Sequence, residues 1–61
     1  MNKDEVVSMM LESINKDNRE MCEKAGMSSA DIESQIQQSQ PSLGYILSNL
    51  YDKLKEANLI A

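Results

Sequence analysis

Residues 41–60 read PSLGYILSNLYDKLKEANLI, and this stretch carries the clearest structural pattern of the chain. Its apolar residues recur at steps of three and four, which places them on one face of a helix. Pro41 is typical of the first turn of a helix, and Asn58 tolerates the left-handed backbone that ends one. The pattern therefore predicts a helix over about 41–57. Its apolar stripe consists of Leu43, Ile46, Leu47, Leu50, Leu54 and Ala57.

A second helical pattern begins near the N-terminus and predicts a helix over about 3–25. Asn2 can cap this helix, and Glu5 stands three residues later, where it can complete a capping box. Gly26 favours the end of the helix because glycine adopts a positive φ at no steric cost. The apolar face of this helix combines Val7, Met10, Leu11, Ile14, Met21, Cys22 and Ala25, with Asn18 as a polar interruption.

The segment between these two patterns, residues 28–40, is polar and rich in serine and glutamine. Ser28 or the serine after it can cap a helix, and Ile32 and Ile36 share one helical face at the i, i+4 spacing. The pattern predicts a short helix over about 29–38, and a mobile loop is the alternative because serine and glutamine stretches also form loops.

Together these patterns predict an all-α fold, a single domain over residues 1–61 that contains three helices. The long first helix and the comparable third helix pack on each other, and the short second helix closes one end. A turn at about 37–42 would make the arrangement helix-turn-helix-like. The chain has 61 residues and contains no Phe or Trp, so we expect a thin core that a partner or a second copy completes.

Charge and composition bear on the compartment and on the class of partner. Ten acidic and six basic side chains give a formal net charge of −4, which argues against nucleic acid as a partner. No stretch approaches the roughly 18 apolar residues of a membrane span, and the N-terminus has neither a basic leader nor an apolar run. The single cysteine, Cys22, fits a reducing compartment. We therefore expect a cytoplasmic protein without a membrane partner.

Residues that usually carry catalysis are sparse in this chain. There is no histidine, so acid–base chemistry would rest on carboxylates or on Cys22, which lies beside an apolar stripe as a buried thiol does. Residues 15–20, NKDNRE, offer oxygen ligands but lack the turning glycine and the distal glutamate of an EF-hand loop. The two glycines stand alone and do not form a phosphate-binding loop. We expect no enzyme activity, no cofactor, no metal and no small-molecule substrate.

Apolar side chains opposite the two stripes, and Val6 and Tyr51 at the stripe edges, are candidates for contact with a partner. Met9 and Tyr45 project almost opposite the stripes, and tyrosine is favoured at protein interfaces. Our hypothesis is a small regulatory or adaptor protein that binds another protein or itself, as a homodimer, through helix surfaces. Asn18 within a stripe could fix the register of pairing. The candidate contact residues are Val6, Met9, Tyr45 and Tyr51.

Residues 47–60, LSNLYDKLKEANLI, resemble the end of the recognition helix in winged-helix regulators of the arsenic- and antibiotic-resistance type. Asn58 replaces the glycine of that pattern, and the sequence reaches Ala61 before a wing. The resemblance implies, as the alternative function, a reduced helix-turn-helix DNA-binding transcriptional regulator that acts as a dimer. The matching residues are Leu47, Ser48, Leu54, Ala57, Leu59 and Ile60, and the residues it turns toward DNA are Tyr45, Ser48, Asn49 and Lys53.

Residues 39–44, SQPSLG, are similar to the signature of small helical-hairpin phosphatases that act on aspartyl-phosphate response regulators in sporulating bacteria. That signature is Ser-Gln, any residue, then Leu-Asp, so this chain has one extra residue and carries Gly44 in place of the aspartate. The resemblance implies a helical hairpin that lacks the acidic member of the motif. It rests on Ile14, Arg19, Met21, Gly26, Ser39, Gln40 and Leu43.

A third hypothesis uses the acidic side chains of the first helix. An acidic helix surface can imitate nucleic acid and occupy the DNA-binding surface of a regulator or nuclease. The residues that would supply this charge are Asp4, Glu5, Asp17 and Glu20.

Overall fold

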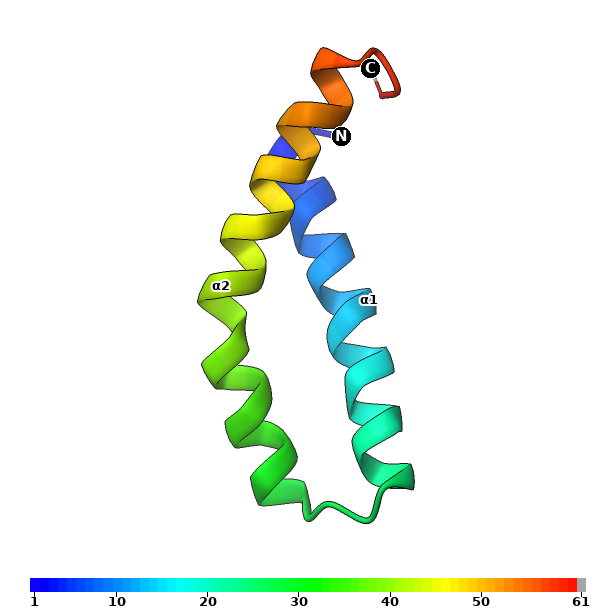
Figure 1. Ribbon diagram of the computed structural model, residues 1–61, viewed down its shortest axis with the longest axis vertical. Coiled ribbons are helices and arrows are strands. Elements are labelled where there is room, and N and C mark those ends of the chain that lie inside the picture. The colour runs from blue at the N-terminus through cyan, green and yellow to red at the C-terminus, as the bar shows by residue number, and fades with distance from the viewer. Residues whose placement is uncertain (61) are drawn as a thin grey trace.

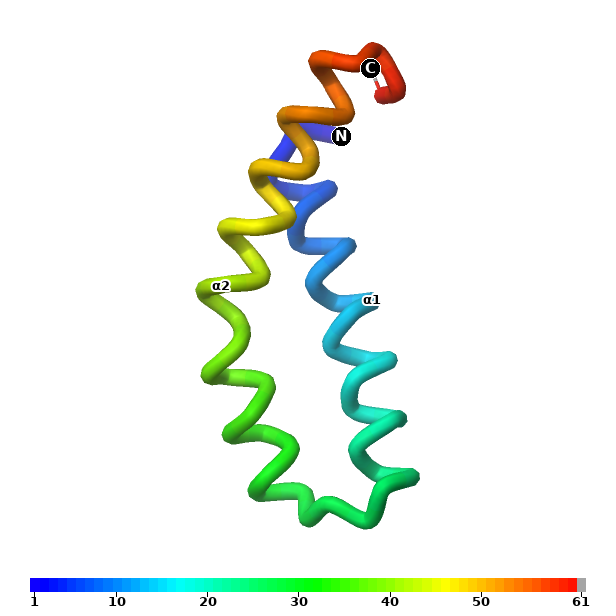
Figure 2. Tube along the Cα trace, viewed as in Figure 1, coloured from blue at the N-terminus to red at the C-terminus, as the bar shows by residue number. Residues whose placement is uncertain are grey.

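The computed structural model describes residues 1–60 and consists of two helices joined by a short turn (Figure 1). Helix α1 spans Lys3–Lys24 and helix α2 spans Ser29–Glu56. The helices run antiparallel, and Figure 2 shows both ends of the chain at the end of the molecule opposite the turn. The molecule is elongated, with extents of 41 × 18 × 16 Å along its principal axes. The fold is therefore an all-α helical hairpin.

The ends of α1 form as the sequence predicts. The Asn2 side chain accepts a hydrogen bond from the backbone N–H of Glu5 at 2.9 Å, and the Glu5 carboxylate accepts the backbone N–H of Asn2 at 3.5 Å, so the capping box is confirmed. Gly26 adopts φ +84° and donates its N–H to the carbonyl of Glu23. The N–H of Met27 reaches the carbonyl of Cys22 at 3.1 Å. These two bonds define a Schellman ending that terminates α1.

The ends of α2 are also set by local residues. Ser28 caps the helix by accepting the N–H of Asp31 on its hydroxyl oxygen at 3.2 Å. At the other end Asn58 adopts φ 58°, and the N–H of Leu59 donates to the carbonyl of Leu54 at 2.9 Å. The predicted role of Asn58 is therefore confirmed, and both helices close in the same way.

The prediction of three helices is wrong, because residues 29–56 form one continuous helix. The expected short helix over 29–38, the turn over 37–42 and the third helix over 41–57 merge into α2, which holds Pro41 in its interior. Proline has no N–H to donate to the carbonyl four residues earlier, and its ring crowds that carbonyl, so a helix bends there instead of ending. Figure 1 shows α2 changing direction near its middle. A helix-turn-helix unit is accordingly not found within residues 1–60.

Contacts with α1 on both sides of Pro41 explain why α2 continues through it. Near the turn, the Arg19 guanidinium pairs with the Glu33 carboxylate. At the level of the proline, Asn15 contacts Gln40, and at the far end Lys3 and Asp52 pair at 3.0 Å. The antiparallel register is thus uninterrupted along α1. A break at 37–42 would separate one half of α2 from this surface, and helical stability in proteins comes mostly from such packing.

The core lies between the two helices and has two apolar parts. Val7, Leu47 and Tyr51 are buried together near the ends of the chain, with Ile32 and Ile36 buried nearer the turn. Polar contacts lie between these parts, including the hydrogen bond from Asn15 Nδ2 to Gln40 Oε1 at 2.9 Å. The side chains packed against the first part are Val6, Met10, Leu11, Ile14 and Ile60. A hairpin of this kind has a single seam, so its core is thin.

Candidate interaction surfaces

The four predicted contact residues do not form one surface. Tyr51 is only 6% exposed and belongs to the core with Val7 and Leu47, so the expectation that it lies at the surface is wrong. Val6 is half-buried and packs against that same cluster. Both residues therefore contribute to the contact between α1 and α2.

Met9 and Tyr45 are exposed, as the sequence predicts. Met9 lies on α1 and is 53% exposed, and Tyr45 lies on α2 and is 72% exposed. Each projects almost opposite the buried residues of its own helix, because their positions differ from Val7 and Leu47 by two residues, or about 200°. They point away from the hairpin on two different faces, so one flat partner cannot contact both.

Two exposed apolar residues on α2 were expected in the core instead. Ile46 is 56% exposed and Leu50 is 44% exposed, although both belong to the predicted apolar stripe. The stripe is wider than α1 can cover, and α1 covers the side that carries Leu47 and Tyr51. Leu43 is half-buried and lies between the covered and the uncovered sides of the stripe. Ile46 and Leu50 therefore form an uncovered edge of the stripe.

A charge pattern in the sequence marks this same region. Residues 34–51 contain no Asp, Glu, Lys or Arg, although charged residues make up 26% of the chain. Most helices exposed on one side carry charges there, whereas the centres of protein interfaces are depleted of charge. This charge-free segment is the signal by which the uncovered edge could have been found from the sequence.

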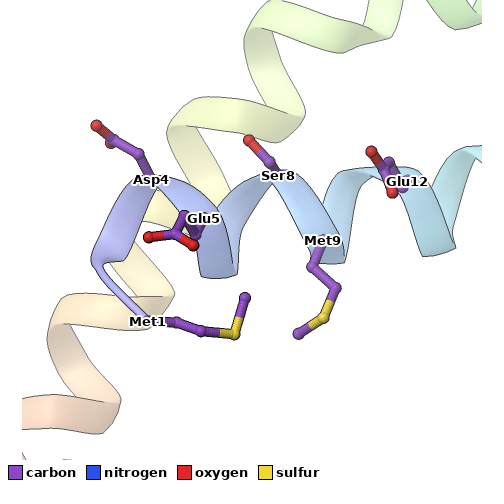
Figure 3. A pocket seen from close by; sticks show the side chains of 6 residues that line it. All are labelled: Met1, Asp4, Glu5, Ser8, Met9 and Glu12. Atoms are coloured by element: carbon purple, nitrogen blue, oxygen red, sulfur yellow. The ribbon is translucent and has the colours of Figure 1, made fainter.

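A shallow depression of about 390 Å³ lies on the outer side of α1 near its start (Figure 3). Figure 3 shows the side chains of Met1 and Met9 extending toward the same side of the helix. Three carboxylates also line the depression. The depression is lined by Met1, Asp4, Glu5, Ser8, Met9 and Glu12. Two of the four residues expected of an acidic mimic, Asp4 and Glu5, therefore lie here, while Asp17 and Glu20 lie farther along α1.

Polar side chains in the middle of the hairpin form one hydrogen bond between the helices and one within α2. Ser39 donates its hydroxyl to the carbonyl of Ile36 at 3.0 Å, and Gln40 accepts the hydrogen bond from Asn15. The Oδ1 atom of Asn15 is buried and has no hydrogen-bond partner among the described residues. The helical hairpin agrees with what the resemblance to phosphatases implies. The Ser39-Gln40 pair of its signature, however, makes its hydrogen bonds within the hairpin.

Cys22 lies beside this polar layer. Its thiol is within hydrogen-bond range of the Asn18 Oδ1 atom at 3.8 Å and the Gln35 Oε1 atom at 3.6 Å. Both neighbours are amide oxygens, which can accept a hydrogen bond from the thiol. Within residues 1–60, no three Cys, Asp or Glu side chains gather as metal ligands.

The residues that would face DNA if the winged-helix resemblance held lie on α2, between positions 45 and 53. Tyr45, Asn49 and Lys53 are exposed, and Ser48 is half-buried. They sit in the interior or last turns of a helix that begins at Ser29, without the preceding helix and turn of a helix-turn-helix unit. The resemblance itself stays a prediction.

Electrostatic contacts between the helices are confined to the surface. The Arg19 side chain is 41% exposed, and its hydrogen bond to the Glu33 side chain raises its pKa further above the ordinary value, so Arg19 stays charged at any working pH. Lys3 and Asp52 are also largely exposed. Such pairs fix the register of the hairpin more than they stabilise it.

Comparisons of the chain with protein-family models, with curated proteins and with solved structures give no match. Neither helix within residues 1–60 combines the length and the apolar character that crossing a membrane requires. The function therefore has to be argued from the surfaces described above.

Proposed function

We propose that this chain is a small, non-enzymatic regulatory or adaptor protein that works by binding protein through the outer side of α2. The observation that supports this most is the exposure of Ile46 and Leu50 next to the buried Leu47 and Tyr51. Two large aliphatic side chains at the i, i+4 spacing form a continuous ridge on a helix, and such ridges dock against other helices.

The surroundings of the ridge support a protein partner. The charge-free segment 34–51 includes Tyr45, Ser42 and Asn49 in addition to the ridge. A binding surface of this composition presents an aliphatic centre, a rigid aromatic and neutral hydrogen-bonding side chains, which is typical of protein interfaces. Nucleic acid would require basic residues for its phosphates, and the segment has none.

The compartment is part of the same proposal. The protein acts in the cytosol, where its one cysteine stays reduced and has no disulfide to form. Cys22 contributes to the layer between the helices, where its thiol lies within hydrogen-bond range of Asn18 and Gln35.

Site-specific photo-crosslinking in the producing cells tests the proposal. A photoreactive amino acid at Ile46 or at Leu50 is expected to give a discrete covalent adduct with protein. The matched control is Lys16, an exposed position on the outer side of α1, where no discrete adduct should form. If neither α2 position gives an adduct above the Lys16 background, the proposal is wrong.

A further inference from the structure

The uncovered ridge is part of a longer seam at coiled-coil spacing. Positions 43, 46, 50, 53 and 57 alternate steps of three and four, which is the spacing of the a and d residues of a heptad repeat. We call this set the outer seam. It lies beside the inner seam, in which Leu47 and Tyr51 pack on α1 and Leu54 is half-buried. The outer seam consists of Leu43, Ile46, Leu50, Lys53 and Ala57.

The chain exposes more surface than a compact monomer of its mass, and the excess is similar to the area that one interface covers. The accessible surface is 4620 Å², whereas a compact monomer of this mass exposes only about 4000 Å². The radius of gyration is 13.7 Å, and a compact domain of this length has one of about 10.5 Å. The excess of about 600 Å² is close to the roughly 800 Å² that each partner buries in a stable interface.

The charge distribution favours a second copy as the occupant. Two chains that each carry a net charge of −4 repel each other unless their contact region is neutral. Residues 34–51 provide such a region, and the charged residues of α2 lie on either side of it. A second copy presents the same charge-free segment, so the centre of the contact buries no charge.

We infer that a second copy of this chain covers the outer seam, with the two α2 helices packed antiparallel around a two-fold axis near Ser48. In this register Ile46 of each copy lies opposite Leu50 of the other. Leu43 lies opposite Lys53, whose aliphatic stem can cover it while the ammonium group reaches water. The result is a four-helix assembly with α1 of each copy outside the central pair. The inference rests on the proposed function, since it names the occupant of the same surface.

A charge-exchange experiment tests both the contact and its register. Two central layers of the dimer each pair Ile46 of one copy with Leu50 of the other. In Ile46→Glu, and likewise in Leu50→Lys, both layers place a charge opposite an aliphatic residue. Each variant alone should therefore sediment as a monomer. When the two variants are mixed, the new Glu and Lys face each other in one layer, and Ile46 and Leu50 remain in the other. The mixture should sediment at twice the 6.9 kDa of one chain, as the unmodified protein should.

The control is Gln38→Glu, which adds the same charge at an exposed position of α2 away from the outer seam. This variant should remain a dimer. Far-UV circular dichroism on the same samples covers the case in which a lone variant unfolds, because mixing must then restore helix together with the dimer mass. A monomeric unmodified protein, a dimer that persists in either single variant, or a mixture that stays monomeric would overturn the inference.

The photo-crosslinking described above separates this inference from the proposed function. An adduct of two identical chains at position 46 supports both. An adduct with a different protein, together with a monomeric mass in solution, retains the proposed function and overturns the second copy as occupant. If no adduct forms, both are wrong.

Discussion

At the scale of single residues, the backbone conformations of Gly26 and Asn58 determine where the two helices end. Both have positive φ, at +84° and 58°, and both are followed by the paired hydrogen bonds of a Schellman ending. These endings depend on residues within one turn of each other. That is why the sequence alone predicts them, together with the caps at Asn2 and Ser28.

Alanine substitution of the two glycines should change stability in opposite directions. Gly26→Ala is expected to lower the free energy of unfolding by about 1 kcal/mol, because an L side chain is strained at positive φ. Gly44→Ala should raise it by roughly 0.5–1 kcal/mol, since Gly44 is helical and an added Cβ meets no atom within 4 Å. Urea unfolding followed by circular dichroism measures both. Equal signs for the two variants would contradict the assigned backbone conformations.

Asn15 has the least complete hydrogen bonding in the contact between α1 and α2. Its Oδ1 atom is buried without a partner while its Nδ2 donates to Gln40. Asn15→Leu is expected to stabilise the hairpin by about 1 kcal/mol, because it removes an unpaired buried polar atom and adds apolar contact. The urea midpoint of unfolding reports the change. A lower midpoint in Asn15→Leu would show that the polar layer stabilises the hairpin.

At the scale of elements, the chief difference between prediction and structure lies at Pro41. The sequence pattern places this residue in the first turn of a third helix, which is where proline is most common. The structure instead keeps it inside α2, because residues on both sides of it contact α1, Glu33 and Gln40 before it and Leu47 and Asp52 after it. Local preference could not reveal this, since the decisive contacts join positions far apart in the sequence.

Burial along α2 could be predicted only in part for a related reason. Periodicity identifies the stripe from Leu43 to Ala57, but it does not tell which edge of a wide stripe faces α1. Tyr51 was expected at the surface and is buried, whereas Ile46 and Leu50 were expected in the core and are exposed. Around the same helix, Ile46 lies about 100° and Leu50 about 140° from Tyr45, so the candidate surface differs from the predicted one.

Replacing Pro41 tests whether the packing of α2 on α1 offsets the free energy that the proline costs the helix. Pro41→Ala restores an N–H that can donate to the carbonyl of Gln37 and removes the ring that crowds it. The variant should gain about 1–3 kcal/mol in free energy of unfolding, with no loss of helical content. Thermal unfolding by circular dichroism checks both quantities. A destabilised Pro41→Ala would mean that the bend in α2 is needed for its contacts with α1.

Surface ion pairs between α1 and α2 contribute little to the free energy of unfolding. Lys3→Ala removes the 3.0 Å contact with Asp52 near the ends of the chain. Because both side chains are substantially exposed, the loss should be below about 1 kcal/mol and should disappear at high salt. Unfolding of the variant and the unmodified protein in low and high salt gives the comparison. A larger, salt-independent loss would place this pair among the main stabilising contacts.

At the scale of the whole molecule, the hairpin is a rod with one thin inner seam and an outer seam that is open to a partner. Its surface exceeds that of a compact monomer by an amount close to one half of a standard interface. The same amphipathic helix, α2, therefore serves two contacts, one with α1 and one with a partner. The central claim is that the second contact is an antiparallel pairing with another copy of α2.

Dipolar distance measurement between single spin labels tests that claim most directly. The labels are placed on Tyr45→Cys and, separately, on Gln38→Cys, in a Cys22→Ser background. Around an axis near Ser48, the two labels at position 45 are separated along the helix by about 9 Å and those at position 38 by about 30 Å, given the rise per residue. The account predicts a short distance for position 45 and a long one for position 38. Equal distances at the two positions, or no dipolar coupling at either, would contradict it.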